Sequence, residues 1–402
     1  MTLADDHLDL RDEDGPGPVR RTLPWWAFGL ANLAVVLVLS LVSWWLLVDP
    51  QWSALGAYPQ PYTALLFWTV IATVWVGFTF QWLGPASLDQ PWRGLVGIGL
   101  TIVIGAAVTV LLAYGWGAVD PSFAATREGG AGFTTGNLFV LFGFFFYVLS
   151  AVNAGHWPWS QGSRQPWTGL GELTLVLVPT MAVYLVLILP NLAVWAEPGG
   201  SLMSIPTVIG WFYSLVVAAV LTGLLAENRP WSFAGRPAAV AAAALVGNAA
   251  LGTVLYFLLL AVARLLMGPD NVTALGDAVT LHAAEIGVCW AFWMIAWANV
   301  FGNRPTRHSP AVNIAVRVIT TFVLAALTYL LYYFVLAQHV LHEPNAGGTL
   351  YGDALGFVDW AVLWMLWYVL FLGSYGLPEI ADDTAPRPSV RRGQSRPSTR
   401  AT

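Results

Sequence analysis

Long runs of apolar residues alternate with short polar turns along most of this chain. Ten of these runs are at least as long as the roughly 20 residues that a helix needs to cross the apolar core of a bilayer. They lie near residues 24–48, 61–84, 91–116, 134–157, 167–192, 205–227, 237–268, 277–302, 310–342 and 350–376. The pattern predicts an all-α polytopic membrane protein with about ten transmembrane helices.

Prolines mark the boundaries of these segments at regular intervals. Those that open every second segment are Pro24, Pro91, Pro166, Pro237 and Pro310. Those that follow the segments between are Pro85, Pro158, Pro230, Pro305 and Pro378. Proline suits the first turn of a helix and the positions just beyond its end. Two interleaved series with a shared period of about 73 residues therefore predict a two-helix hairpin repeated five times.

Five similar hairpins can close into a ring, with either series of helices on the inside. Such a ring is similar in architecture to the anion channels related to tellurite-resistance and plant guard-cell channels. No motif of this chain matches that family, so the similarity concerns the arrangement of helices and carries no function. A closed bundle around a catalytic site is the alternative arrangement.

Composition supports a membrane location and excludes several classes of protein. The chain has 402 residues, of which 57% are hydrophobic and 10% charged, whereas soluble domains carry about 25% charged residues. The polar residues 1–23 and the Arg-, Pro- and Ser-rich residues 379–402 are predicted to be disordered tails around a transmembrane domain at 24–378. We find no nucleotide-binding glycine motif and no hydrolase motif. The basic runs are short and lie in the tails, so no nucleic-acid partner is expected.

Arginine placement predicts the orientation. The turns on one side carry Arg93, Arg164, Arg229, Arg236, Arg304 and Arg307, and the tails add more, whereas the other side has Arg127 and Arg264. Basic residues favour the cytoplasmic side of a cell membrane. Both termini are therefore expected in the cytoplasm, which agrees with an even number of spans.

Ionisable residues inside apolar segments are costly and point to a partner, a cavity or a pathway. Glu172 and Arg317 lie six and seven residues after their opening prolines, at a similar depth. One interpretation is a paired gate or anion site at the inner mouth. The other is an interfacial ion pair, or side chains that extend to water.

A second group lies toward the outer side. His282 and Glu285 are spaced i, i+3 and so share one helical face, and Asp359 lies at a similar depth in the last segment. His339 and His342 share another face, with Glu343 directly after them and Asp353 nearby. Imidazole and carboxylate groups together suit Zn, Cu or Fe. A metal site, a proton pathway and a structural hydrogen-bonded cluster all fit this pattern.

Three functions follow from these observations. The first is a channel or secondary transporter for a small solute or ion, with Glu285, His282 and Asp359 at an outer site and Glu172 and Arg317 at the inner mouth. The second is a membrane-embedded metalloenzyme with His282, Glu285, His339 and His342 as ligands. The third is a non-catalytic subunit that packs against a membrane partner or a second copy of itself.

Overall fold

The computed structural model describes residues 22–197 and 199–380, and almost all of their regular structure is helical. Ten helical stretches in this part of the chain are long and apolar enough to cross a membrane. Their bounds are Trp25–Leu47, Tyr62–Thr79, Trp92–Ala118, Glu128–Asn153, Trp167–Leu192, Ile205–Leu225, Pro237–Met267, Pro269–Asn299, Pro310–His339 and Ala354–Phe371. The all-α polytopic fold predicted from the apolar runs is confirmed.

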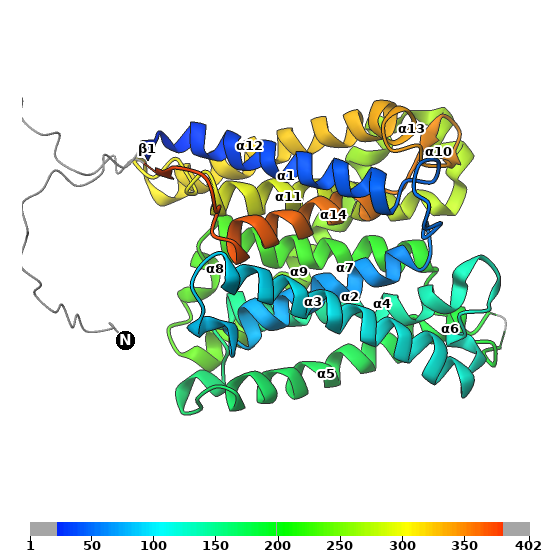
Figure 1. The fold of residues 1–402 in the computed structure, drawn as a ribbon, viewed down its shortest axis with the longest axis horizontal. Helices are drawn as coiled ribbons and strands as arrows, with labels where there is room; N and C mark the ends of the chain where they lie inside the picture. Colours follow the sequence, from blue (N-terminus) through cyan, green and yellow to red (C-terminus); the bar gives the residue numbers. More distant parts are fainter. Residues whose placement is uncertain (1–21, 198, 381–402) are drawn as a thin grey trace, which may run out of the picture.

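Each stretch is named here by its main helix. These are α1 (Trp25–Leu47), α2 (Tyr62–Val74), α3 (Trp92–Val110), α4 (Ala131–Val148), α5 (Trp167–Leu187), α7 (Ile205–Val220), α9 (Pro237–Met267), α11 (His282–Asn299), α12 (Pro310–Leu331) and α14 (Ala354–Met365). Shorter helices are α6 (Leu189–Leu192), α8 (Arg229–Ser232), α10 (Pro269–Leu275) and α13 (Ala337–His339). The long helices run side by side along the longest axis of the molecule (Figure 1).

Five of these helices form a closed inner ring. The contacts run from α2 to α4, α7, α11 and α14 and back to α2. Within an 18-residue apolar window of each corresponding stretch, 67–83% of the residues are buried, against 22–39% in the windows of α1, α3, α5, α9 and α12. We call the first five the inner helices and the other five the outer helices. The ring is therefore lined by the second helix of each predicted hairpin.

The outer helices pack on the ring differently from the predicted hairpins. Helices α3, α5, α9 and α12 contact the inner helix that precedes each of them, and α1 contacts α14. The predicted pairs were joined by the opposite loops, as in α1 with α2. The sequence shows which helices are joined by short loops. It does not show which helices pack together, because that depends on how their side chains fit against the ring.

Small residues allow an outer helix to approach the ring closely. The buried residues of α3 are Gly94, Gly97, Thr101, Gly105 and Thr109. Gly105 lies against Thr69 of α2, and a methyl group there would come within 2.9 Å of the Thr69 backbone nitrogen. Such stripes of small residues favour close helix contact in membranes.

All inner helices end with the same backbone geometry. A residue of positive φ donates its N–H to the carbonyl six residues earlier, which spans one residue more than the 6→1 bond of a Schellman helix end. These residues are Trp82, His156, Asn228, Asn303 and Ser374. The geometry thus recurs once per inner helix, while the period of about 73 residues over the whole sequence stays a prediction.

The two described chain ends lie at the same end of the molecule. Strand β1 (Thr22–Leu23) pairs in parallel with β4 (Glu379–Ile380) beside α1 (Figure 1). The four residues at the edges of the predicted tails therefore belong to a strand pair, and the rest of both tails lies outside the described residues. We call this the terminal end and the opposite one the far end. The far end carries α6, α10, α13 and the antiparallel strands β2 (Asn345–Gly347) and β3 (Leu350–Tyr351).

Candidate functional site

The centre of the inner ring holds two cavities. The far-end cavity has a volume of about 260 Å³, and the residues on its helical walls include Phe67, Asn137, Tyr213 and Asp359. The terminal-end cavity measures about 120 Å³ and is lined by residues from all five inner stretches. The inner helices all run from the far end to the terminal end. Residues in the first half of each inner stretch therefore line the far-end cavity, and residues in the second half line the terminal-end cavity. The two cavities therefore lie one after the other along the ring axis.

Phe144 of α4 lines both cavities. On α2 the far-end cavity ends at Val70 and the terminal-end cavity begins at Val74, and on α7 the same step runs from Val216 to Val220. Four residues correspond to about 6 Å of helix rise. On α2, α4 and α7 about one layer of side chains, which includes Phe144, thus separates the cavities.

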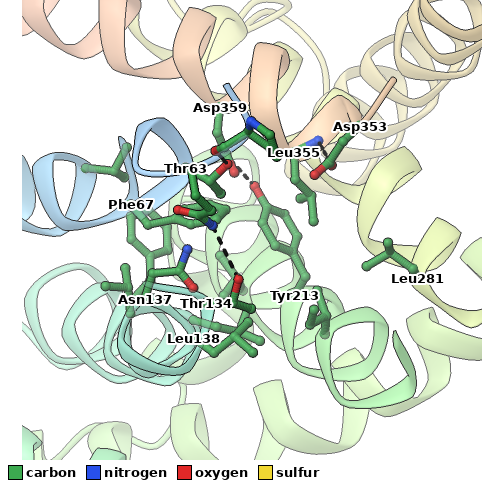
Figure 2. A pocket seen from close by; sticks show the side chains of 18 of the residues that line it. Thr63, Phe67, Thr134, Asn137, Leu138, Tyr213, Leu281, Asp353, Leu355 and Asp359 are labelled. Carbon is green, nitrogen blue, oxygen red and sulfur yellow. Dashed lines mark hydrogen bonds between the residues drawn. The ribbon is translucent and has the colours of Figure 1, made fainter. Parts of the chain in front are cut away.

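The far-end cavity combines apolar walls with a few polar groups (Figure 2). Tyr213 donates its hydroxyl hydrogen to Asp359 Oδ1 over 3.0 Å, and the second oxygen of this carboxyl has no hydrogen-bond partner among the described residues. Asn137 is 3% exposed, and its Oδ1 also has no partner there. Gln60 donates to Thr134 over 3.4 Å. The cavity therefore presents unused acceptors next to aromatic and aliphatic surface.

The terminal-end cavity is almost wholly apolar. Its walls include Phe78, Val148, Val220 and Leu366, and Asn299 is the polar residue on its described lining. Asn299 donates to the carbonyl of Ile295 in its own helix. A bare ion would lose its water here and find few oxygen atoms to replace it, which is strongly unfavourable.

Beside the far-end cavity lies a buried group of acids and tyrosines. Asp353 lines the cavity, and its Oδ1 accepts the Leu355 N–H over 3.0 Å. The same N–H donates to Glu285 Oε2 over 3.1 Å. Glu343 accepts hydrogen bonds from Tyr332 and, over 3.5 Å, from Tyr58. We call these residues the acid–tyrosine cluster.

Burial dominates the electrostatics of this cluster. It raises the pKa of Asp353 and, more strongly, that of Glu343, where the nearby Asp353 carboxylate adds to the effect. Burial likewise raises the pKa of Tyr58. The carboxyl groups of Asp353 and Glu285 both approach the Leu355 N–H at the edge of the cavity.

The structure divides the predicted metal ligands. His282 Nδ1 lies 2.8 Å from the Tyr329 hydroxyl on α12, whereas the neighbouring Glu285 turns toward α14. His342 pairs with Asp49 over 2.8 Å, and His339 is exposed. In the described part of the chain no three His, Cys, Asp or Glu side chains are arranged to hold a metal ion. The i, i+3 spacing of His282 and Glu285 predicts one ligand face. In the structure, two different neighbouring helices supply their hydrogen-bond partners.

Glu172 and Arg317 are not brought together either. Glu172 is fully buried on α5, where its Oε2 lies 2.8 Å from His156 Nδ1. Arg317 on α12 donates to Glu227 over 2.8 Å and to the carbonyls of Leu225 and Pro305 over 2.9 Å. Both lie on outer helices and neither lines a cavity. Glu172 and Arg317 each make local contacts at the terminal end, and they do not form a paired gate with each other.

Of the five predicted pathway residues, Asp359 alone lines a described cavity. Sequence reasoning missed Asn137, Tyr213 and Phe144, which lie in apolar runs without a charged neighbour. An uncharged polar residue in such a run was the available signal for Asn137. Phe144 stands in the run Phe142–Tyr147, where no pattern distinguishes it from the other aromatic residues.

Comparison of this chain with protein-family models, with curated proteins and with solved structures finds no match.

Proposed function

We propose that this protein is a channel or secondary transporter that moves a small solute through the centre of its inner ring. The observation that carries the proposal is the pair of cavities on the ring axis, separated by the layer that contains Phe144. Binding sites near the bilayer midplane, bounded by a closed layer of side chains, are typical of transporters. The structure then corresponds to a closed state, and the path opens when Phe144 moves.

The lining favours a solute with apolar surface over a bare inorganic ion. The terminal-end cavity offers one polar side chain, Asn299, on its described walls. The effective cost of taking an ion out of water into such surroundings is several kcal/mol. An organic molecule with few polar groups avoids most of this cost.

We further propose that the protein lies in the cell membrane with its terminal end in the cytoplasm. The described arginines support this orientation, because Arg127 and Arg264 belong to the far end and the others to the terminal end. In this orientation the far-end cavity faces the outside, and the terminal-end cavity faces the cytoplasm.

Removal of the Phe144 ring tests the proposed path. Wild type, Phe144→Ala and the control Phe146→Ala are reconstituted in vesicles, because Phe146 lies on the same helix but lines neither cavity. Fluxes of glycerol, tetramethylammonium and methanesulfonate are measured, which cover a neutral, a cationic and an anionic solute. We expect Phe144→Ala to raise the flux of at least one solute above that of both other proteins.

Equal fluxes in all three proteins and in empty vesicles, with Phe144→Ala correctly folded, would refute the path. That result would favour the third predicted function, a membrane subunit without transport activity.

A further inference from the structure

The far-end cavity contains two side-chain oxygen atoms without a hydrogen-bond donor among the described residues, and these indicate the chemistry of what it binds. This inference rests on the proposed function and names its substrate class. The free oxygen of Asp359 and the unpartnered Oδ1 of Asn137 are acceptors, and the side chains that hold them are 6% and 3% exposed. Buried acceptors without a donor are costly. An occupant that carries N–H or O–H donors would supply the missing bonds.

The charges on the cavity lining indicate whether a positively charged or a negatively charged occupant fits. The ionisable side chains on the described lining are Asp353, Asp359 and Tyr213, and no arginine or histidine lies among them. The chain has no lysine that could extend into the cavity. Anions would meet two carboxyl groups there and would find only uncharged amide and hydroxyl donors. A positively charged occupant would instead pair with Asp359.

Shape and surface argue against a metal ion as this occupant. Hard cations take about six to eight oxygen ligands, whereas much of this lining is Phe67, Val70, Leu138, Leu141 and Ile209. Aromatic rings of Phe67, Phe144 and Tyr213 line the same space, and ring faces attract organic cations. The volume of about 260 Å³ lies just below the range of about 300–1,000 Å³ found for drug-sized ligands.

We infer that the far-end cavity binds a small protonated amine with an apolar body, whose N–H groups bond to Asp359 and Asn137 and whose body packs on the aromatic wall. Figure 2 shows the arrangement on which this depends, with Asp359 and Tyr213 on one side of the cavity and Asn137 and Thr134 on another. In this arrangement the ammonium group pairs with the Asp359 carboxylate, so its charge is not left unpaired when it leaves water.

Isothermal titration of the full-length protein in lipid nanodiscs tests the inference at neutral pH. The probes are benzylammonium, benzyl alcohol and benzoate, which have nearly the same size and carry a positive, a zero and a negative charge. We expect benzylammonium to bind about 10- to 100-fold more tightly than benzyl alcohol, which is the range for a hydrogen bond to a charged group. Benzoate should not bind measurably.

Two variants assign the contacts. Asp359→Asn keeps the shape and should reduce benzylammonium affinity to that of benzyl alcohol. Asn137→Leu should weaken benzylammonium by about tenfold, the factor expected for one lost bond to a charged group. The control Asp277→Asn makes the same charge change at an exposed far-end residue and should bind like wild type. Benzyltrimethylammonium, which has no N–H, should bind more weakly than benzylammonium.

The outcomes separate this inference from the proposed function. Tighter binding of benzoate or benzyl alcohol overturns the amine inference and leaves the path intact. If no probe binds but Phe144→Ala conducts, the amine inference is likewise overturned and the path stays intact. If Asp359→Asn does not fold, equal benzylammonium binding by Asn137→Leu and wild type overturns the inference. Absence of both binding and conduction overturns the amine inference and the path together.

Discussion

The contact between α3 and α2 can be tested with two glycines on one helix. Gly105 faces Thr69 of the inner ring, whereas Gly99 has no atom within 4 Å of the position where a Cβ would lie. The substitutions Gly105→Ala and Gly99→Ala therefore add the same methyl group to the same helix. They differ only in what the methyl group meets.

The expected magnitude follows from the distances. A methyl group at Gly105 lies 2.9 Å from the Thr69 nitrogen and 3.0 Å from its Cα, about 0.5 Å short of the ~3.5 Å at which non-bonded atoms attract. Because backbone atoms cannot rotate away, α3 and α2 must move apart, and overpacking of this kind costs about 1–3 kcal/mol. At Gly99 the same change should be neutral or stabilise by up to about 1 kcal/mol through helix propensity.

Equilibrium unfolding of the purified variants in mixed micelles measures the difference directly. We expect Gly105→Ala to be less stable than Gly99→Ala by about 1–4 kcal/mol. It should also weaken ligand binding, because a displaced α2 carries Phe67 and Val70 of the cavity wall with it. Equal stability of the two variants would refute the packing of α3 on the ring by close backbone approach.

Three further predictions concern single buried groups. Arg317→Met should cost about 1–3 kcal/mol in unfolding free energy, since it removes the donor of the Leu225 and Pro305 carbonyls while the 44% exposed Glu227 carboxylate stays hydrated; a loss no larger than that of the exposed control Arg307→Met would contradict this. Burial holds the pKa of Glu343 above its ordinary value of 4.5, so wild-type stability should fall as pH rises from about 4.5 through the raised pKa. Glu343→Gln should reduce the dependence of the thermal unfolding temperature on pH, and an unchanged dependence would contradict this prediction. Cys289 is fully buried, so maleimide should label it only after denaturation; labelling of the native protein would show that its helix face is open.

Much of the fold could be predicted from the sequence, because length and apolarity alone decide whether a helix can cross a bilayer. The ten stretches occur where the apolar runs place them, although the eighth begins as α10 and a separate turn before α11. Gly276 has a positive φ at this break, which a hydropathy pattern does not show. The sequence does not show which helices form the inner ring and which lie outside it. The burial of each helix in the structure decides this.

The candidate site was much harder to predict. Charged residues inside apolar runs indicated Glu172, Arg317, His282 and Glu285, but the fold uses them in local contacts and none of them is among the lining residues of the ring cavities. Asp359 was found because a carboxyl group in an apolar run is conspicuous. Asn137 and Phe144 were not found, because nothing in their local sequence shows that they face the ring axis.

The sequence by itself determined that this chain crosses a membrane about ten times, since burying the backbone in lipid requires helices of a set length and polarity. The tertiary structure alone decided which helices form the ring, which side chains lie along its axis and which charged groups pair with one another. These depend on contacts between residues that are dozens to hundreds of positions apart, such as Tyr213 with Asp359. A local pattern fixes which face of a helix is polar, but only the packed neighbours decide whether that face meets lipid, a partner helix or an open cavity.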